Sequence, residues 1–288
     1  MTRPVTLEGL SSVAILGAGK IGGAFVRQIL QKTGIRVYAT GRRVETLRGA
    51  ESLGAVATRD NDEAVRRSEL VVIAVKPYHF PQLLSEVKQE SWKGKIVVSL
   101  MAGVKLATLR AALHGAKVFR AMPNLNAYVG KSSTAVSENL YDDASRTVEE
   151  FLGLFGQVYW VPEEYLDVWT GLAGSGPAFI AEVLDALAMG AVAAGMPREL
   201  SYKAVLDVLE GTAILLKNGF YQHPAMLRDD VTTPAGTTIR GLMVLESGGV
   251  KATLMKVIEA AARRSREIGN EIDSRIREKI NSRIGHTA

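Results

Sequence analysis

The stretch VAILGAGKIG, residues 13–22, decides the fold of this chain. Four apolar residues that suit a buried strand lead directly into glycines at positions 17, 19 and 22. The first glycine allows a tight turn, the second lets a pyrophosphate approach the backbone, and the third lets the next helix pack closely on the strand. The stretch therefore predicts a dinucleotide site. The residues expected at the dinucleotide are Gly17, Ala18, Gly19, Lys20, Ile21 and Gly22.

The first half of the chain alternates short apolar runs with helix-length stretches. The apolar runs cover residues 13–16, 36–39, 70–75, 95–100 and 117–121. The stretches between them include 20–32 and 44–53, and two later strands at 133–137 and 157–161 are joined by a helix through 144–155. Short strands separated by helices are typical of a parallel sheet covered on both faces. The sequence thus predicts an N-terminal Rossmann-type, doubly wound α/β domain.

The second half of the chain has a helical pattern and no β-rich run. The expected helices cover residues 165–172, 177–195, 199–218, 239–247 and 250–284. The helix from Pro177 is apolar almost all round after Asp185, so it must be buried on every side, and a domain of about 125 residues has too little interior for that. We therefore expect residues 1–162 to bind the dinucleotide. Residues 163–288 should form an all-α dimerisation and substrate domain, in a homodimer or a higher assembly of dimers.

Composition narrows the function classes. The chain has 288 residues, no cysteine and four histidines without ligand spacing, so we expect neither thiolate chemistry nor a metal site. The formal charge of +5 arises partly from basic residues near the C-terminus that alternate with acids, as on a solvated helix face, so no nucleic-acid partner is expected. No signal-peptide pattern is visible, and Glu182 and Asp185 leave the apolar helix too short an uncharged run to span a bilayer. We expect no membrane partner and a cytoplasmic location.

The end of the second strand indicates which dinucleotide binds. An NAD enzyme places an acid there for the ribose hydroxyls, but this chain reads ATGRR over residues 39–43 and has no acid before Glu45. Thr40 can donate a hydrogen bond, and Arg42 and Arg43 can pair with a 2′-phosphate. Two arginines at a helix start also oppose the helix dipole, which a phosphate would offset. The sequence favours NADPH, with NADH possible.

A threonine-rich segment near the C-terminus, DVTTPAGTTI over residues 230–239, indicates a second ligand site. The apolar run that follows predicts a helix whose first turn is Gly236-Thr237-Thr238. Free N–H groups and the positive end of the helix dipole suit a small carboxylate there. The alternative is a helix start that the threonines merely cap after a proline turn.

Several motifs in order along the chain resemble the pyrroline-5-carboxylate reductase family. Besides the glycine loop and the threonine segment they are AVKP at 74–77, AGV at 102–104, RAMPN at 120–124, GSGPAF at 174–179, and His223-Pro224 with LRD at 227–229. Departures are Leu125-Asn126 where the family has Thr-Pro, KSS at 131–133, and Ala235 in place of a second glycine. Ala235 matters if that position needs positive φ, which costs alanine about 1 kcal/mol or more.

The resemblance implies hydride transfer from NADPH to the C=N carbon of a cyclic imine that carries a carboxylate, giving L-proline. It implies that Thr238 hydrogen-bonds the imine nitrogen as the catalytic hydroxyl, and that Thr233, Gly236 and Thr237 hold the carboxylate. Glu163 and Asp230 are candidate carboxylates near the cationic nitrogen, or else a helix cap and a surface acid. The cofactor contacts that it implies beside the glycine loop are Ala74, Val75, Lys76, Pro77, Ala102 and Gly103. Lys76 suits phosphate neutralisation or a structural role better than proton donation.

Two other functions compete with this interpretation. An NADP-dependent imine or β-hydroxyacid reductase shares the domain plan, but such families use a lysine on the long second-domain helix, and residues 174–195 contain no lysine or arginine. A non-catalytic NADP-sensing protein on the same fold would not need the threonine segment.

Overall fold

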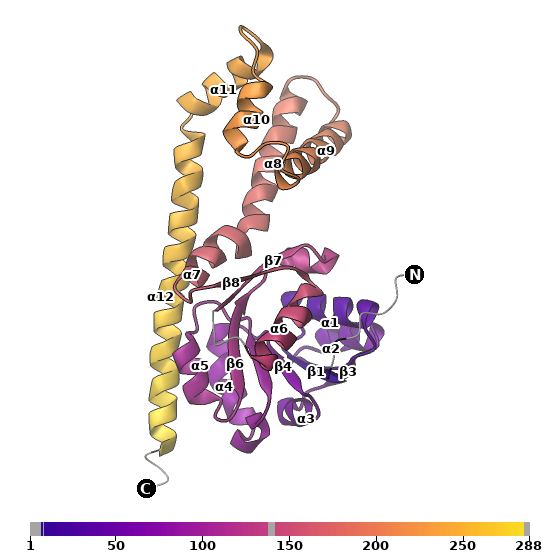
Figure 1. Ribbon diagram of the computed structural model, residues 1–288, viewed down its shortest axis with the longest axis vertical. Helices are drawn as coiled ribbons and strands as arrows, with labels where there is room; N and C mark the ends of the chain where they lie inside the picture. The colour runs from indigo at the N-terminus through magenta and orange to yellow at the C-terminus, as the bar shows by residue number, and fades with distance from the viewer. Residues whose placement is uncertain (1–6, 8, 138–141, 285–288) are drawn as a thin grey trace. The chain divides into compact units, whose positions relative to one another are not determined.

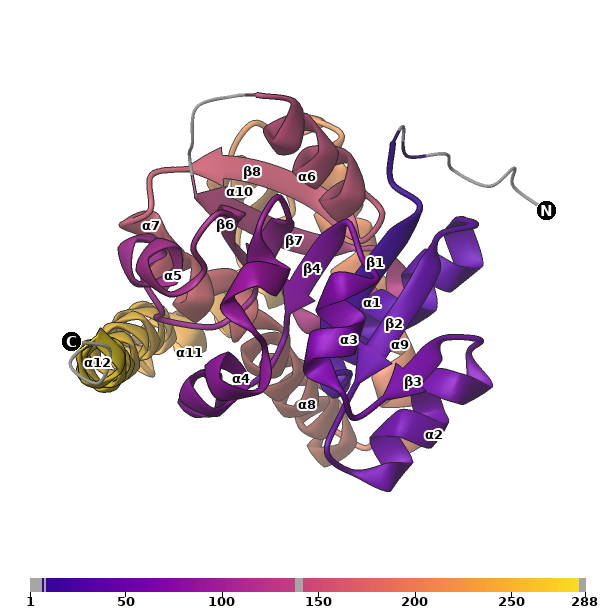
Figure 2. The same cartoon turned by 90° about the horizontal axis from the view of Figure 1, so that it is seen from below.

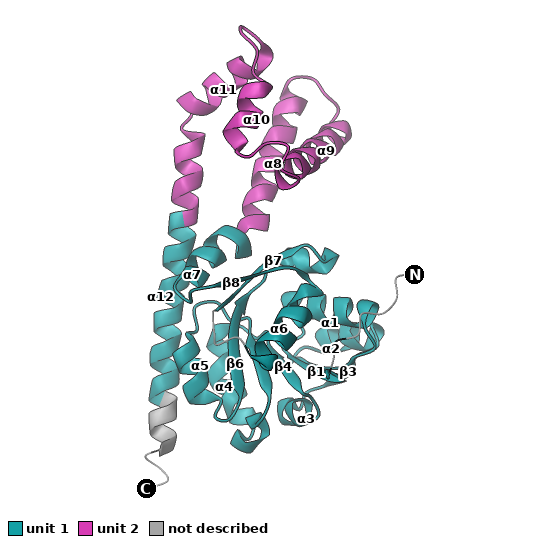
Figure 3. Ribbon diagram, in the orientation of Figure 1, with its two compact units in different colours: residues 1–175, 259–288 teal, residues 176–258 magenta. Residues whose placement is uncertain are grey.

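The computed structural model describes residue 7, residues 9–137 and residues 142–284. The chain divides into two compact units (Figure 3). Unit 1 comprises residues 1–175 and 259–288, and unit 2 comprises residues 176–258. This division differs from the expected boundary near Pro162, because the residues just after that proline and the C-terminal helix pack with the sheet of unit 1.

Unit 1 is built on a sheet that has eight strands within the described residues (Figure 1). The strands are β1 (Ser12–Leu16), β2 (Arg36–Thr40), β3 (Val56–Thr58), β4 (Leu70–Ile73), β5 (Ile96–Ser99), β6 (Lys117–Met122), β7 (Ser132–Ser137) and β8 (Gly156–Val161). Their order is β3-β2-β1-β4-β5-β6-β7-β8, and β1 to β6 run parallel. The predicted Rossmann-type α/β domain is confirmed.

Two details of the sheet differ from the sequence prediction. The sheet is not parallel throughout, since β7 runs antiparallel to β6 and β8 is parallel to β7. The connection from β6 to β7 contains only the 3-10 helix η3 (Leu125–Val129), which is too short for the crossover that a parallel pair requires. Strand β3 was not predicted, because it is a three-residue edge strand without an apolar run.

Helices cover both faces of the sheet (Figure 2). The helices of unit 1 up to β8 are α1 (Lys20–Lys32), α2 (Val44–Ser52), α3 (Asn61–Arg66), η1 (Pro77–His79), α4 (Phe80–Glu86), η2 (Gln89–Trp92), α5 (Leu106–Ala112) and α6 (Asp143–Gly153). Side chains of α1, α2 and α6 belong to one buried cluster, and those of α3, α4 and α5 to the other. The two clusters lie on opposite faces, because alternate residues of a strand point to opposite sides.

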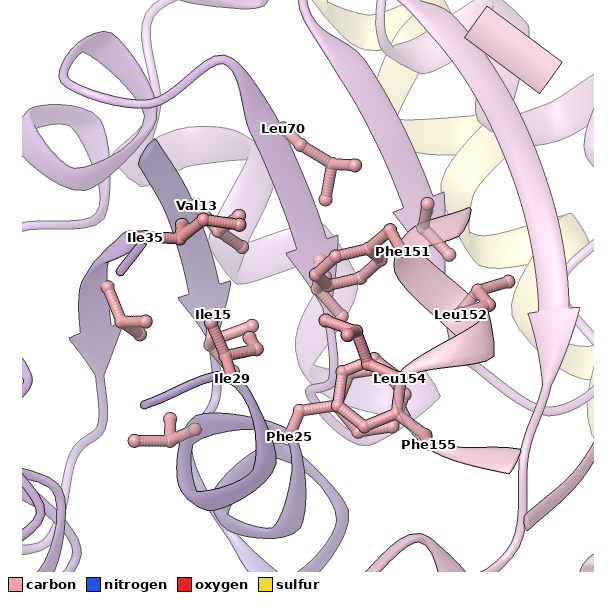
Figure 4. Packing of buried hydrophobic residues seen from close by; sticks show 14 of the residues in the cluster. Val13, Ile15, Phe25, Ile29, Ile35, Leu70, Phe151, Leu152, Leu154 and Phe155 are labelled. Carbon is pink, nitrogen blue, oxygen red and sulfur yellow. The ribbon is translucent and has the colours of Figure 1, made fainter. Parts of the chain in front are cut away.

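Strand β1 shows this alternation directly. Val13 and Ile15 belong to the first cluster and Ala14 and Leu16 to the second, and all four are fully buried. A central strand buried on both faces requires an apolar run without polar alternation, which the sequence supplies. In the first cluster the rings of Phe25 and Phe155 stack with centroids 3.8 Å apart, joining α1 to the connection between α6 and β8 (Figure 4).

The remaining helices confirm the all-α second half. They are α7 (Tyr165–Trp169), the π-helical η4 (Thr170–Gly174), α8 (Gly176–Ala193), α9 (Arg198–Lys217), α10 (Pro224–Asp230), α11 (Thr237–Ser247) and α12 (Val250–Ile284). Helices α7 and η4 belong to unit 1, α8 to α11 belong to unit 2, and α12 contributes residues to both. Helix α10, of seven residues, was not predicted.

The helices of unit 2 expose large apolar side chains in the single chain. Leu187 on α8 is 55% exposed, Val208 on α9 is 65% exposed and Val244 on α11 is 70% exposed. The helical run Tyr165–Ala193 is long and apolar enough to cross a membrane by length and composition alone. Its most apolar 18-residue window is 6% buried in the single chain. It is longer than predicted because α7 and the π turn lead directly into α8.

Candidate cofactor and substrate sites

The glycine loop between β1 and α1 has the geometry that a pyrophosphate needs. Gly17 has φ +95°, and a Cβ there would lie 3.0 Å from the backbone nitrogen of Val75. A Cβ on Gly22 would collide with the carbonyl oxygen of Gly17, so helix and loop touch at backbone level. Gly19 directly precedes α1, with open space where its Cβ would be, and no side chain caps the helix. The free N–H groups and the space in front of them fit a dinucleotide phosphate.

Thr40 holds this loop from the end of β2. Its carbonyl oxygen accepts a hydrogen bond from the N–H of Ala18 at 2.7 Å, and its Oγ1 accepts one from the N–H of Gly17 at 3.2 Å. The residue is 2% exposed. The hydroxyl therefore helps to position the loop that would bind the phosphates. Because it accepts in this contact and can still donate, the predicted hydrogen bond from Thr40 to the cofactor stays a prediction.

Arg42 and Arg43 lie on the surface directly after β2. Arg43 precedes the first residue of α2, as the sequence implied, and neither guanidinium pairs with a carboxylate among the described residues. Nη2 of Arg42 instead contacts Nε2 of His79 at 2.5 Å. His79 was not predicted, because the contact joins residues 37 positions apart. The only signal in the sequence is that both residues follow strands that flank β1.

The segment after β4 lies against the glycine loop. The N–H of Ala74 donates to the carbonyl oxygen of Leu16 at 2.8 Å, and Val75 packs against Gly17. Lys76 is exposed, its side chain has no partner in the part of the chain that is described, and Pro77 begins η1. β1 pairs with β2 on one side and β4 on the other, so this is the switch point at which open parallel sheets bind ligands.

The loop after β5 has a packing role that the sequence did not reveal. Gly103 has φ +79°, and a Cβ on it would lie 2.6 Å from the backbone nitrogen and Cα of Gly269 in α12. A Cβ on Gly269 would in turn lie 2.8 Å from the carbonyl carbon of Gly103. The two glycines let helix and loop touch at backbone level. Ala102 is partly buried beside Met122 and Leu166. Contact of either residue with the cofactor stays a prediction.

Glu163 lies in a charged cluster around the buried Arg120. Its Oε1 accepts from Nη1 of Arg120 at 3.1 Å and from the N–H of Leu106 at 2.6 Å, which places it at the start of α5. Nη2 of Arg120 donates to Oδ1 of Asp167 at 3.1 Å, which also accepts from the hydroxyl of Ser265 in α12 at 2.8 Å. The cluster ties β6, α5, α7 and α12 together. Of the two roles the sequence left open for Glu163, these contacts support the structural one.

In unit 2 the threonine segment forms the predicted helix start. Helix α11 begins at Thr237 after Gly236, without a side-chain cap or an acid in its first turn. The hydroxyl of Thr232 donates to the carbonyl oxygen of Arg228 at 2.6 Å, whereas the hydroxyls of Thr233, Thr237 and Thr238 have no hydrogen-bond partner among the described residues.

The turn before α11 is tight. The N–H of Gly236 donates to the carbonyl oxygen of Thr233 at 3.1 Å, and a Cβ on Gly236 would collide with Oγ1 of Thr233. Ala235 has φ +58°, the one positive φ at a non-glycine residue within the described chain. The strain that the sequence made conditional on positive φ is therefore present. Free hydroxyls and an open helix start leave room for a small carboxylate.

Asp230, at the end of α10, is bonded to a tyrosine that the sequence analysis did not consider. Its Oδ2 accepts a hydrogen bond from the Tyr221 hydroxyl at 2.5 Å. This hydrogen bond, more than burial and the charge of Asp230, raises the pKa of Tyr221. Tyr221 precedes α10, and Asp230 is the last residue of that helix, shortly before the threonines of the segment.

Comparison with known proteins gives matches over most of the chain. The family described as pyrroline-5-carboxylate reductase dimerisation matches residues 163–268, and the family described as NADP oxidoreductase, coenzyme F420-dependent, matches residues 12–103. Pyrroline-5-carboxylate reductase 3 of Macaca fascicularis is 37% identical over 266 residues, covering 90% of this chain and 96% of that protein.

Solved structures agree with these matches. The 1-pyrroline-5-carboxylate reductase of Streptococcus pyogenes has a TM-score of 0.79 and 28% identity, covering 89% of this chain and 98% of that one. The NADP-bound pyrroline carboxylate reductase of Plasmodium falciparum has a TM-score of 0.81 at 24% identity, covering 92% of this chain and all of that one, and shows the shared fold.

Proposed function

The chain belongs to the pyrroline-5-carboxylate reductase family, and from this membership we infer that it reduces 1-pyrroline-5-carboxylate to L-proline with NAD(P)H, the last step of proline biosynthesis. The observation that carries the inference is the identity of more than a third over nine-tenths of the chain. The glycine loop and the threonine segment, one for each ligand of that reaction, are both intact. The chain is an NAD(P)H-dependent oxidoreductase that acts on a C=N bond.

The cofactor side of the reaction falls to unit 1. NADPH supplies the hydride, and the residues of the chain bind and orient it. We propose that the first turn of α1 and the glycine loop hold the pyrophosphate, that Arg42 and Arg43 recognise the 2′-phosphate, and that residues 74–77 and 102–103 border the nicotinamide end. Neither arginine has a carboxylate partner within the described residues, which supports this assignment and the preference for NADPH over NADH.

The substrate side falls to the threonine segment of unit 2. We propose that Thr233, Gly236 and Thr237 hold the substrate carboxylate and that the Thr238 hydroxyl hydrogen-bonds the imine nitrogen. The hydroxyls of these three threonines have no partner in the described part of the chain, which supports the proposal, while Thr232, whose hydroxyl is already bonded, is left out of it. Asp230 remains the candidate carboxylate near the cationic nitrogen. Glu163 is the weaker candidate because it pairs with Arg120.

A homodimer is part of the proposal, since the match to a dimerisation family covers residues 163–268 and the helices of unit 2 leave apolar side chains uncovered. Residues 163–288 are proposed as the dimerisation and substrate domain, and residues 1–162 as the NADP domain. Higher assembly of dimers and action in the cytoplasm extend the same proposal. The missing lysine in residues 174–195 still argues against a β-hydroxyacid or other imine reductase.

The deciding experiment follows NADPH oxidation with pyrroline-5-carboxylate as the only added substrate. Turnover is expected, and an acyclic imine and a β-keto acid should react far more slowly. NADPH binding without turnover of any imine would indicate the non-catalytic sensor instead.

Cofactor choice has its own test. Arg42→Ala combined with Arg43→Ala should weaken NADPH binding by on the order of 2–3 kcal/mol through lost charge-assisted hydrogen bonds, and should change NADH binding little. An equal loss for both cofactors would show that these arginines do not recognise the phosphate.

A further inference from the structure

His79 and Arg42 meet above the carboxyl end of the sheet. Arg42 follows β2 by two residues, and His79 ends η1 in the segment that follows β4. Both strands pair in parallel with β1, so their carboxyl ends lie on either side of the glycine loop. The contact of 2.5 Å therefore joins the two sides of the proposed cofactor site at the position of the second strand, where a dinucleotide places its adenosine ribose.

The contact fixes the protonation state of His79. A guanidinium only donates hydrogen bonds, so Nε2 of His79 accepts and the ring is neutral, with its proton on Nδ1. Burial, and after it the positive charge of Arg42, lowers the pKa of His79, and no carboxylate of the described residues opposes the two effects. The other group that faces the imidazole is the Tyr78 ring, with centroids 4.2 Å apart.

We propose that His79 is a second ligand of the 2′-phosphate of NADPH and, with Arg42, makes the site selective for the phosphorylated cofactor. The inference rests on the proposed function, since it assumes that the dinucleotide occupies this edge of the sheet. A phosphate dianion has three acceptor oxygens and can accept from the guanidinium and from a protonated imidazole together. In the contact with Arg42, Nε2 of His79 carries no proton. A hydrogen bond to the phosphate requires that Nε2 carry one, so phosphate binding favours the protonated ring.

Proton linkage follows from this arrangement. Without phosphate, burial and then the charge of Arg42 hold the pKa of His79 below its ordinary value, and a dianion beside the ring would raise that pKa. Between the two values, NADPH binding takes up a proton at His79. NADH has no 2′-phosphate, so its binding carries no such uptake.

Calorimetric titration of the purified full chain with NADPH and with NADH tests the proposal, using the wild type, His79→Gln and the matched control His114→Gln, which changes an exposed histidine on another loop. At about pH 6 the His79→Gln change should weaken NADPH roughly tenfold, the effect of one charged hydrogen bond. At about pH 8.5, where the imidazole is neutral, the loss should fall below about threefold. NADH affinity and the His114→Gln variant should stay at wild-type values.

Calorimetric titrations in buffers of different ionisation enthalpy give the number of protons that the protein takes up when NADPH binds. The wild type should take up more protons with NADPH than His79→Gln does, and the phosphate's own titration cancels in that difference. A second variant, His79→Lys, keeps a permanent cation and should bind NADPH with little dependence on pH. Equal weakening of NADPH and NADH in His79→Gln would overturn the proposal, as would unchanged NADPH affinity at about pH 6. A wild type that binds neither cofactor would instead refute the proposed function.

Discussion

The four threonines of the segment before α11 differ in what their hydroxyls contact. Thr232 is bonded to Arg228, whereas Thr238 has no partner among the described residues. If Thr238 hydrogen-bonds the imine nitrogen, Thr238→Ala should lower kcat/KM by roughly 10- to 100-fold, about 1.4–2.7 kcal/mol. NADPH affinity should stay near the wild-type value, because the cofactor contacts proposed here belong to unit 1.

Two neighbouring threonines provide the controls for that measurement. Thr233→Ala should act mainly by raising KM, since a carboxylate contact is made equally in the ground and transition states. Thr232→Ala removes a hydroxyl that is already bonded and should leave kcat/KM within about twofold. If Thr238→Ala keeps wild-type kcat/KM, its hydroxyl does not bond the imine nitrogen and Asp230 becomes the first candidate.

Ala235 stores backbone strain beside this site. Its φ of +58° costs an alanine about 1–2 kcal/mol, while a glycine there would lose about 0.5–1 kcal/mol more chain entropy on folding. The difference favours Ala235→Gly, which should raise the free energy of unfolding by up to about 1 kcal/mol. Ala225→Gly, in the first turn of α10, should lower it, and thermal melts of both variants compare the two positions. A lower Tm for Ala235→Gly would show that the neighbouring turn, not φ, limits this loop.

The carboxylate of Asp62 in α3 joins that helix to the segment before β5. Its oxygens accept from the N–H of Lys88 at 3.0 Å, the hydroxyl of Ser91 at 2.6 Å and Nε of Arg66 at 3.0 Å. Burial raises the pKa of Asp62, but these three donors together outweigh burial and hold the pKa below its ordinary value. The stabilisation is therefore present above the unfolded pKa of about 3.9 and is lost as pH falls through the folded value.

Asp62→Asn should accordingly lower the free energy of unfolding by about 1–3 kcal/mol at neutral pH, and the gap to the wild type should close below about pH 4. Denaturant titrations at several pH values measure this, with the exposed Glu45→Gln as the control. A gap that stays constant down to about pH 3 would mean that the carboxylate charge contributes nothing.

The part of α12 that belongs to unit 1 packs on the loop after β5 through Gly269. Alanine at position 269 would improve helix propensity by about 1 kcal/mol, but its Cβ would press on the backbone of Gly103, and overpacking costs about 1–3 kcal/mol. The clash involves backbone and cannot be relieved by turning a side chain, so Gly269→Ala should lower Tm. Ser274→Ala, on the exposed side of the same helix, should not. An unchanged Tm for Gly269→Ala would show that the helix shifts freely.

Sequence patterns predicted most elements, because their causes are local. The glycine loop is set by backbone sterics within ten residues, and β1 by its apolar run. The antiparallel β7 depends on the length of a connection, and β3 on pairing with β2, which no short window encodes. The same limit applies to the site. The threonine segment, residues 230–239, is predictable from its own side chains, whereas the partners of Arg42 and Glu163 lie 37 and 43 residues away and are not.

Assembly decides whether the apolar helices of unit 2 are covered. If a second copy covers them, the interface should exceed ~2,000 Å², as in obligate dimers, and sedimentation should show no monomer at micromolar concentration. Leu187→Lys, in the middle of α8, should shift the equilibrium towards monomer and reduce activity, because a charge would enter the interface. A stable, active monomer of the wild type would contradict the proposal.

The contact between Gly103 and Gly269 also limits how the molecule can change in length. One residue added to α12 shortly before position 269 would rotate everything after it by about 100°, carrying the glycine off the loop and a side chain into its place. Insertions and deletions should therefore be absent from this part of α12 among functional variants of the chain.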